Sequence, residues 1–515
     1  MGYLLGIDVG TSGTKALLID ASGCVAARST REYPLYTPHP GWAEQDPEDW
    51  WQATLDTIRD VLQQSRVPAS EVLAIGLSGQ MHGAVLLDSS DRVLRPAILW
   101  CDQRTADQCA WITETVGKET IVDLTMNPVL TGFQAPKIIW VRDNEPAVYD
   151  RIRRVLLPKD FVRLRLTGEY ATEVSDASGT SLFNVRERKW ADPILSALQI
   201  PREWLPESHE SFEVSGKISQ QAAGLTGLKA GTPVVGGGGD QAAGAVGNGI
   251  VRSGVVSSTV GTSGVVFAFS DKPTQDPDLR VHTFCHAVPQ KWHVMGVHMS
   301  AGGSLRWLRD TMAQPEKVVA AGMGTDPYDL MSLEAARAPV GSEGLLFLPY
   351  LTGERTPHPD PDARGVFFGI GLRHDRTHFF RSVMEGVAYS LRDSFEIFRG
   401  MGIPVNEVRA SGGGARSALW RQIQADVTGH AQRAINVDEG PALGVALLGG
   451  VGAGVYSSVE QACDAVIHVV ASTDPVPENM EVYARYYKVY RELYTALRAA
   501  FRMNAEAVRL SSQVR

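Results

Sequence analysis

The chain has 515 residues, with 49 basic and 58 acidic side chains and a net charge of −9. Its length predicts about two to four domains, and the dispersed charge offers no basic stripe for nucleic acid or an anionic membrane. With 44% hydrophobic residues the composition excludes disordered and fibrous classes. The five cysteines are scattered without a CxxC pair, which disfavours disulfide frameworks and zinc clusters and favours a reducing cytoplasm.

The N-terminal segment lacks a basic leader and predicts a strand over 3–9 rather than a signal peptide. A Gly-Thr-Ser-Gly turn at 10–13 separates it from a second apolar run over 15–19. A helix is predicted over 46–63, because Asp46 is a suitable N-cap. Short β-branched runs then alternate with segments of helical period, which predicts an α/β fold with further strands at 72–78, 84–87 and 154–157.

The Gly-Thr-Ser-Gly turn recurs at 261–264, again between apolar strands. The surrounding segment 253–270 is uncharged and long enough for a membrane span, but its Ser, Thr and Gly content favours two strands around a turn. Because each copy opens about half of the chain, we infer two related domains that face one another. The Gly- and Pro-containing stretch 228–250 is the expected junction.

The last third of the chain predicts three helices. The first covers 375–398 and ends near the glycines at 400 and 402, and the second covers 417–427. The third, over 482–501, carries its aromatic and leucine side chains on one face, which predicts an amphipathic helix that packs on the body of the protein.

Glycine-rich turns indicate phosphate binding, because several backbone N–H groups can point at one anion. Neither a Walker P-loop nor an N-terminal dinucleotide fingerprint is present. Asp8 instead ends a strand beside the first Gly-Thr-Ser turn, where its carboxylate could hold a hydrated Mg²⁺. A simple hairpin capped by an aspartate remains an alternative at this position.

A second acid, Asp240, follows the four glycines at 236–239. Without side chains on its approach, the carboxylate is open to a bulky ligand. A helix cap is the alternative role for an aspartate here. The glycine run favours a functional carboxylate, suited to take the proton from a hydroxyl that attacks a phosphoryl group.

A third feature is the Gly-Gln-Met-His-Gly turn at 79–83, although a lone histidine such as His82 is more often structural than functional. The following Trp100 and Asp102 add an aromatic ring and a polar group of the kind that line sugar pockets.

With these residues in place, the chain resembles the FGGY family of carbohydrate kinases nearly end to end. The resemblance is carried by GIDVGTS at 6–12, GLSGQMHG at 76–83, LWCD at 99–102, LPKD at 157–160, DQAAG at 240–244, LPYLTGERTP at 348–357 and GGGARS at 412–417. The family's C-terminal signature is filled over 365–385. Its N-terminal signature is met by Lys137, Trp140 and Val141, with Gln134 where Thr, Ser or Pro is usual.

The resemblance implies an actin-like ATPase fold, with two ribonuclease H-like lobes and an active-site cleft between them. Residues 1–247 would form the N-terminal lobe, with the sugar site and part of the phosphate site. Residues 248–515 would form the C-terminal lobe, which binds the nucleotide. Whether the C-terminal helix packs back on the first lobe is left open.

Carried over by position, the resemblance makes Asp240 the catalytic base and Asp8 the acid that handles Mg-ATP. The sugar contacts would be Met81, His82 and, with a glutamine where some relatives have asparagine, Gln241. The residues that would face the phosphates are Gly10, Thr11, Ser12, Gly261 and Thr262. Those that would border adenosine are Gly413, Gly414 and Ser417.

The activity implied is phosphate transfer from Mg-ATP to D-xylulose, giving D-xylulose 5-phosphate and ADP. A kinase for ribulose, gluconate or glycerol stays open, as does a non-catalytic actin-like ATPase scaffold, in which His82, Trp100 and Asp102 would have no reason to converge. No nucleic-acid or membrane partner is expected. Dimers are common in the family, which leaves a homodimer open.

Overall fold

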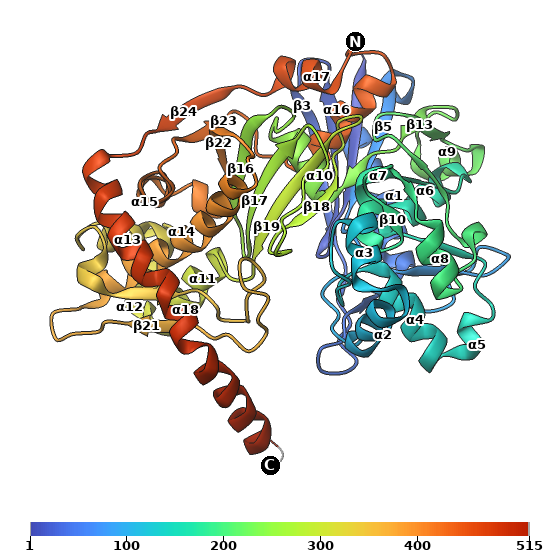
Figure 1. The fold of residues 1–515 in the computed structure, drawn as a ribbon. Coiled ribbons are helices and arrows are strands. Elements are labelled where there is room, and N and C mark those ends of the chain that lie inside the picture. The colour runs from blue at the N-terminus through green and yellow to red at the C-terminus, as the bar shows by residue number, and fades with distance from the viewer. Residues whose placement is uncertain (1, 513–515) are drawn as a thin grey trace.

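A computed structural model describes residues 2–512, which form two lobes, each built on a seven-stranded sheet (Figure 1). The first sheet has the strand order β13 (Val214–Lys217), β14 (Pro233–Val235), β5 (Val72–Gly79), β1 (Tyr3–Val9), β2 (Gly13–Asp20) and β3 (Val25–Glu32), with β15 (Gly238–Gly239) also on β5. The second has the order β18 (His282–Cys285), β19 (Trp292–His298), β17 (Gly264–Ser270), β16 (Gly254–Val260), β22 (Val405–Ser411), β23 (Gln432–Ile435) and β24 (Val469–Thr473).

The two sheets share one connectivity. In the first, β1, β2 and β3 are antiparallel neighbours and β1 runs parallel to β5. In the second, β16, β17 and β19 are antiparallel neighbours and β16 runs parallel to β22. Each Gly-Thr-Ser-Gly turn closes the first hairpin of its sheet, through bonds from Gly10 N to Gly13 O (3.1 Å) and from Gly261 N to Ser263 O (3.0 Å). The predicted repeat of two related α/β units is therefore confirmed.

Side-chain alternation along β1 covers both faces of the first sheet. Leu5 packs into a core with helix α1 (Pro47–Ser65), whose N-cap is Asp46 as the sequence predicted. Leu4 points the other way, into a core with helices α10 (Asp240–Gly247) and α16 (Pro441–Gly452). Both faces of this strand are therefore buried, which accounts for its nearly continuous apolar run.

Helix α16 comes from the second half of the chain yet packs directly on β1 and β5 of the first sheet. Glycines make this approach possible: a methyl group on Gly6 would lie 1.8 Å from the carbonyl oxygen of Ala442, and one on Gly76 would lie 1.9 Å from that of Val445. Helices α10 and α16 pack against each other between the sheets (Figure 1). The lobes are thus joined by crossing helices.

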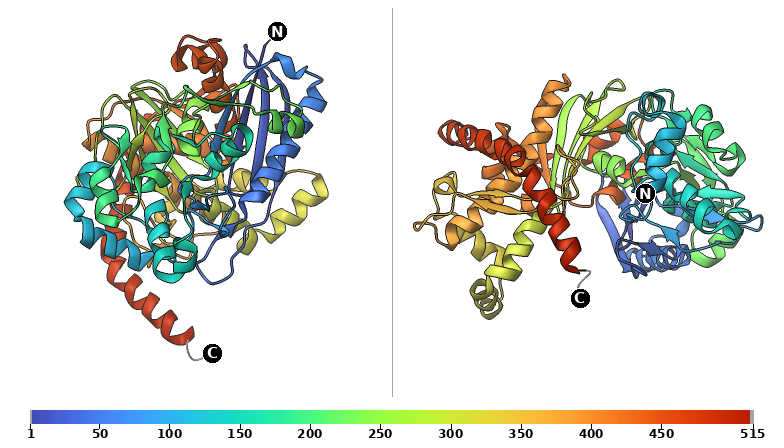
Figure 2. Two further views of the ribbon diagram at one scale, coloured as in Figure 1. Left: turned by 90° about the vertical axis from the view of Figure 1, so that its right-hand side faces the viewer. Right: turned by 60° about the horizontal axis from the view of Figure 1, so that its bottom comes forward.

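The three helices predicted in the last third are present as α14 (Arg376–Gly400), α15 (Ala418–Thr428) and α18 (Pro477–Ser512). Asp375 and Ser417 cap the first two. Helix α18 packs on α14, α15 and β20 (Leu346–Leu348), so the packing that the sequence left open is on the second lobe. Its far end projects from the body (Figure 2).

The peripheral elements extend each lobe. Those of the first lobe are β4 (Glu44–Gln45), β6 (Val85–Leu87), β7 (Ala97–Ile98), α2 (Ala106–Val116), α3 (Lys118–Thr125), α4 (Gln134–Asn144), α5 (Pro146–Tyr149), β8 (Arg154–Leu156), α6 (Pro158–Thr167), β9 (Ala171–Glu173), α7 (Val174–Ala177), β10 (Phe183–Asn184), β11 (Lys189–Trp190), α8 (Asp192–Leu198), β12 (Glu207–His209) and α9 (Gln220–Thr226). Those of the second are α11 (Gly302–Met312), α12 (Gln314–Met323), α13 (Pro327–Ala335), β21 (Val366–Phe368) and α17 (Val459–Val466). Within residues 2–512, no helix has the length and apolarity to cross a membrane.

Candidate active site

Asp8 lies near the carboxyl end of β1, between Lys15 on β2 and Ser78 on β5. Its Oδ1 atom is buried without a hydrogen-bond partner in the described part of the chain. Burial raises the pKa of Asp8 to about 6, against the opposing influence of the Ser78 hydroxyl and the Lys15 ammonium group. A buried carboxylate oxygen left unsatisfied calls for a ligand to complete it.

Asp240 reaches the same end of the sheet. The preceding strand β15 pairs with β5, which also pairs with β1, so the strands that lead to Asp240 and Asp8 lie two spacings apart, about 10 Å. The turn depends on Gly237, which has a φ of 73° and would collide with the carbonyl of Leu77 if it carried a side chain. Burial, and then the negative charge of Asp8, raise the pKa of Asp240 to about 7, while hydrogen bonding from Gln241 opposes the rise. The two acids thus share one electrostatic environment.

The Met81–His82 turn lies against the approach to Asp240. A methyl group on Gly239 would lie 2.9 Å from Cγ of Met81, so Met81 covers the peptide that precedes the acid. His82 has a φ of 71° and its ring packs against that of Phe133, with the centroids 4.7 Å apart and the planes tilted by 34°. The Nδ1 atom of His82 lies 2.7 Å from the carbonyl oxygen of Gly179. The structure therefore places the Met81–His82 turn beside Gly239, the residue before Asp240.

The ring of His82 is held in one protonation state. Burial and the nearby charge of Lys137 lower its pKa well below the ordinary value, so the imidazole is neutral. Because a carbonyl can only accept, Nδ1 carries the hydrogen that is donated to Gly179. Nε2 is then a hydrogen-bond acceptor.

Trp100 hydrogen-bonds to the first Gly-Thr-Ser-Gly turn. Its indole Nε1 donates to Oγ1 of Thr11 at 2.9 Å, and that hydroxyl donates to Oε1 of Gln80 at 3.2 Å. Gln80 in turn donates to Gln45, which donates to the carbonyl of Thr11 at 2.7 Å. The network fixes the turn at 10–13 to the Gln-Met-His turn.

Asp102 is fully buried, and both oxygens of its carboxylate accept hydrogen bonds. It accepts from Ala43 N at 2.6 Å and from the guanidinium of Arg104 at 2.7 to 3.0 Å. These bonds fix the loop beneath Trp100. A direct contact of Asp102 with sugar stays a prediction.

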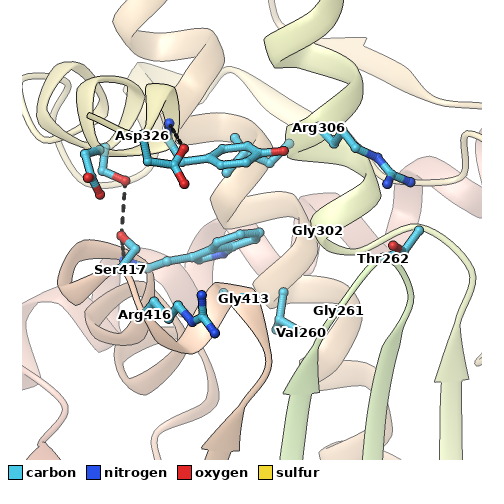
Figure 3. A pocket seen from close by; sticks show the side chains of 15 residues that line it. Val260, Gly261, Thr262, Gly302, Arg306, Asp326, Gly413, Arg416 and Ser417 are labelled. Carbon is cyan, nitrogen blue, oxygen red and sulfur yellow. Dashed lines mark hydrogen bonds between the residues drawn. The ribbon is translucent and has the colours of Figure 1, made fainter. Parts of the chain in front are cut away.

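The second lobe contains a cavity of about 560 Å³ (Figure 3). Five of its lining residues are those predicted from sequence to face nucleotide, namely Gly261, Thr262, Gly413, Gly414 and Ser417. The wall opposite Ser417 is formed by residues of α11 and α13 that sequence reasoning missed, including Arg306, Asp326 and Ser332. The Ser417 hydroxyl lies 3.2 Å from that of Ser332 and joins the two walls.

This cavity adjoins the second Gly-Thr-Ser turn. Amide groups at the start of α11 lock the turn, since Gly302 N donates to Gly261 O at 2.8 Å and Gly303 N to Thr262 O at 2.9 Å. The rim at Gly413 is open, because a methyl group there would meet nothing within 4 Å. The cavity size and the aromatic ring of Tyr328 suit a flat heterocycle whose phosphates extend toward the turn.

Two family models match the chain. The N-terminal domain of the FGGY family of carbohydrate kinases matches residues 3–247, and the C-terminal domain matches residues 256–453. The chain belongs to the FGGY family of carbohydrate kinases. The resemblance inferred from the sequence is confirmed, and so is the activity class of a carbohydrate kinase.

Relatives of this FGGY kinase cover it nearly end to end. A xylulose kinase of Escherichia coli is 41% identical, over 96% of this chain and 99% of its own. One of Bacillus subtilis is 39% identical, over 96% of this chain and 97% of its own. A gluconokinase of Bacillus subtilis is 33% identical, over 95% of both.

Solved structures support the two-lobed fold of FGGY kinases predicted here. A xylulose kinase structure from Brucella ovis matches with a TM-score of 0.88 and 37% identity, over 97% of this chain and all of that chain. A gluconate kinase structure from Lactobacillus acidophilus matches with a TM-score of 0.90 and 26% identity, over 97% of this chain and 99% of that chain.

Lys137, quoted above only as part of a family signature, proves to hold the His82 turn of this kinase. Its Nζ donates to the carbonyl oxygens of His82 at 2.8 Å and Gly132 at 2.6 Å. Burial lowers the pKa of Lys137 to about 7. The buried Nζ group thus ties the positive-φ residue His82 to the loop that carries its ring neighbour Phe133.

Proposed function

We propose that this kinase transfers the γ-phosphoryl group of ATP to O5 of D-xylulose. The observation that supports the proposal is the close approach of Met81 to Gly239, the residue that precedes Asp240: a methyl group on Gly239 would lie 2.9 Å from Cγ of Met81. Relatives at 38 to 41% identity over at least 95% of this chain are xylulose kinases. Residues 1–247 would supply the sugar site and residues 248–515 the nucleotide cavity.

Asp240 would act as the general base. A pKa of about 7 places its proton exchange near neutral pH, where about half of the carboxyl groups are ionised and a base is efficient. It would take the O5 proton as oxygen attacks phosphorus, and positioning would supply most of the remaining rate.

His82 would orient the sugar. Because Nδ1–H donates to the carbonyl oxygen of Gly179, Nε2 would accept a hydrogen bond from a sugar hydroxyl. Met81 would pack on the carbon skeleton, and Gln241, next to the base, would add a polar sugar contact. Trp100 and Asp102 would border the sugar from the loop that hydrogen-bonds to the first Gly-Thr-Ser turn.

Mg²⁺ is the metal that this site fits. The buried and unsatisfied Oδ1 of Asp8 is a hard oxygen donor beside a glycine-rich turn, which is the chemistry that Mg²⁺ prefers. Among residues 2–512 no cluster of three or more side-chain ligands is present, so water and phosphate oxygens would complete the coordination. When bound, the ion would neutralise charge on the phosphate groups.

ATP would lie with its adenosine in the 560 Å³ cavity, bordered by Gly413, Gly414 and Ser417. Its phosphates would extend between the two Gly-Thr-Ser turns, that is, between Gly10, Thr11 and Ser12 on one lobe and Gly261 and Thr262 on the other. The backbone N–H groups and the cation would supply the attraction, since the chain as a whole is acidic.

Gluconate is the second candidate substrate, and one observation favours it. The charge of Arg355 lies near enough to lower the pKa of both His82 and His282. Within the described residues its guanidinium has no acidic partner within ion-pair distance, so it could receive the carboxylate of an acidic sugar.

The test is a panel of D-xylulose, D-ribulose, D-gluconate and glycerol, assayed for ADP release. We expect D-xylulose to have the highest kcat/KM, with at least about tenfold discrimination, and the product to carry its phosphate at O5. Faster turnover of gluconate would replace the proposal with the second candidate. Absence of any sugar-dependent ADP release would reject both.

A further inference from the structure

Glu173, at the end of β9, has a carboxylate that is fully buried and accepts hydrogen bonds from three separate segments. On its own segment it caps α7, accepting from the backbone N–H groups of Ser175 at 2.7 Å and Asp176 at 2.8 Å. It also accepts from the hydroxyl of Ser211 at 3.0 Å. A third backbone N–H donor lies much further along the chain.

That donor is Gly239, whose N–H donates to Oε1 of Glu173 at 3.2 Å. The same N–H also donates to Oγ of Ser175 at 3.1 Å. Gly239 immediately precedes Asp240, and its peptide sets the position from which α10 begins. Helix α7 also contacts β15, the strand that contains Gly239. Glu173 is therefore hydrogen-bonded to the residue that immediately precedes the proposed base.

The same carboxylate fixes the segment that orients His82. The turn of α7 capped by Glu173 runs directly into a 3-10 turn over Ser178–Thr180. This turn contains Gly179, whose carbonyl accepts from Nδ1 of His82, and a methyl group on Gly179 would lie 2.4 Å from that ring. A displacement of α7 would move the acceptor that sets the tautomer of His82.

We propose that Glu173 is a positioning residue that fixes the catalytic aspartate and the sugar-binding histidine relative to one another. This inference rests on the proposed function, because it takes Asp240 as the base and His82 as a sugar ligand. In every hydrogen bond of its side chain within the described residues, Glu173 is the acceptor. Lys159 lies with Nζ 3.7 Å from Oε1 and is shared with two closer carboxylates, those of Asp160 at 2.8 Å and Asp176 at 3.0 Å.

Glu173→Gln keeps the shape but places an amide NH₂ against at least one inward-pointing N–H group. We expect kcat with D-xylulose to fall about tenfold to a hundredfold, since small displacements of reacting groups cost that much. The KM for sugar should rise as His82 loses its fixed acceptor. The KM for ATP should change less than about twofold, because the nucleotide cavity lies on the other lobe.

Ser211→Ala is the matched control, because it removes one bond to Glu173 without touching Gly239 or α7. We expect this variant to keep wild-type kcat and sugar KM. If Glu173→Gln fails to fold, Ser175→Ala removes the second acceptor of Gly239 N and should lower kcat by a smaller factor. The positioning role is overturned if folded Glu173→Gln has wild-type kinetics. If the Gln variant does not fold, wild-type kinetics for Ser175→Ala would overturn it instead.

The positioning role can fail separately from the proposed function. If the sugar panel selects another substrate, the same variants are measured with that sugar, because Glu173 holds the peptide and the histidine whichever sugar binds. A normal response to xylulose in the wild type, together with equal kinetics for Glu173→Gln and Ser211→Ala, would reject the positioning role alone. Equal changes in the KM for sugar and for ATP would also reject it, since they would indicate a general structural defect.

Discussion

Gly444→Ala tests the packing of the two helices that join the lobes. A methyl group on Gly444 of α16 would lie 1.8 Å from the carbonyl oxygen of Ala243 on α10. Since non-bonded heavy atoms prefer separations of about 3.5 Å, the helices would have to part by roughly 1.5 Å at this point. Helix α10 begins at Asp240, so parting the helices displaces the proposed base.

The expected loss of stability follows from two opposing effects. Forcing a methyl group into a packed interface costs about 3 kcal/mol when the obstacle is backbone, the upper end of the usual range for overpacking. Alanine gains about 1 kcal/mol over glycine in a helix. The free energy of unfolding should therefore fall by about 2 kcal/mol, and kcat should fall by up to about a hundredfold if the base moves by 1 Å.

Gly244→Ala is the control on the partner helix. A methyl group there would meet only Pro441, at 3.6 Å, which is an ordinary contact. Its helix propensity should make it neutral or slightly stabilising. Urea unfolding and steady-state ADP release compare the two variants. Equal stability and equal kcat for Gly444→Ala and Gly244→Ala would refute the claim that α10 and α16 are in tight contact.

Three further results are expected. Burial and the charge of Asp8 favour the protonated form of Asp240, so its base form is lost as the pH falls through about 7. The kcat/KM for sugar should therefore drop about tenfold from pH 8 to pH 6. A flat profile down to pH 5 would contradict the raised pKa. Asp102→Asn should lower the free energy of unfolding by about 3 kcal/mol, since it breaks the buried pair with Arg104; unchanged urea denaturation would contradict that role. Lys137→Met should raise the KM for sugar and leave the KM for ATP unchanged, and the opposite pattern would place its effect on the other lobe.

Local chemistry made much of the fold predictable from the sequence. The two Gly-Thr-Ser-Gly hairpins and the helices capped by Asp46, Asp375 and Ser417 depend on contacts within a few residues, and these were expected before the structure. Asp8 and Asp240 could each be singled out as candidate functional acids, because Asp8 ends a strand just before a Gly-Thr-Ser turn and Asp240 follows four glycines.

Contacts between distant segments could not be predicted in the same way. The packing of α18 on the second lobe depends on Tyr483, Tyr487 and Tyr490 meeting a core built by α14, and periodicity alone does not say which surface receives them. The role of Glu173 depends on Gly239, some 66 positions later in the chain. Lys137 was visible as part of a motif, but only the structure shows its bonds to His82 and Gly132.

The most direct test of Asp240 as the general base compares Asp240→Asn with the wild type for both turnover and sugar binding. Calorimetry should show D-xylulose binding to Asp240→Asn within a few-fold of wild type, while its ADP release with saturating sugar and Mg-ATP falls by at least about a hundredfold, the usual size of a general-base contribution. Turnover near the wild-type rate would contradict the assignment of Asp240 as the base.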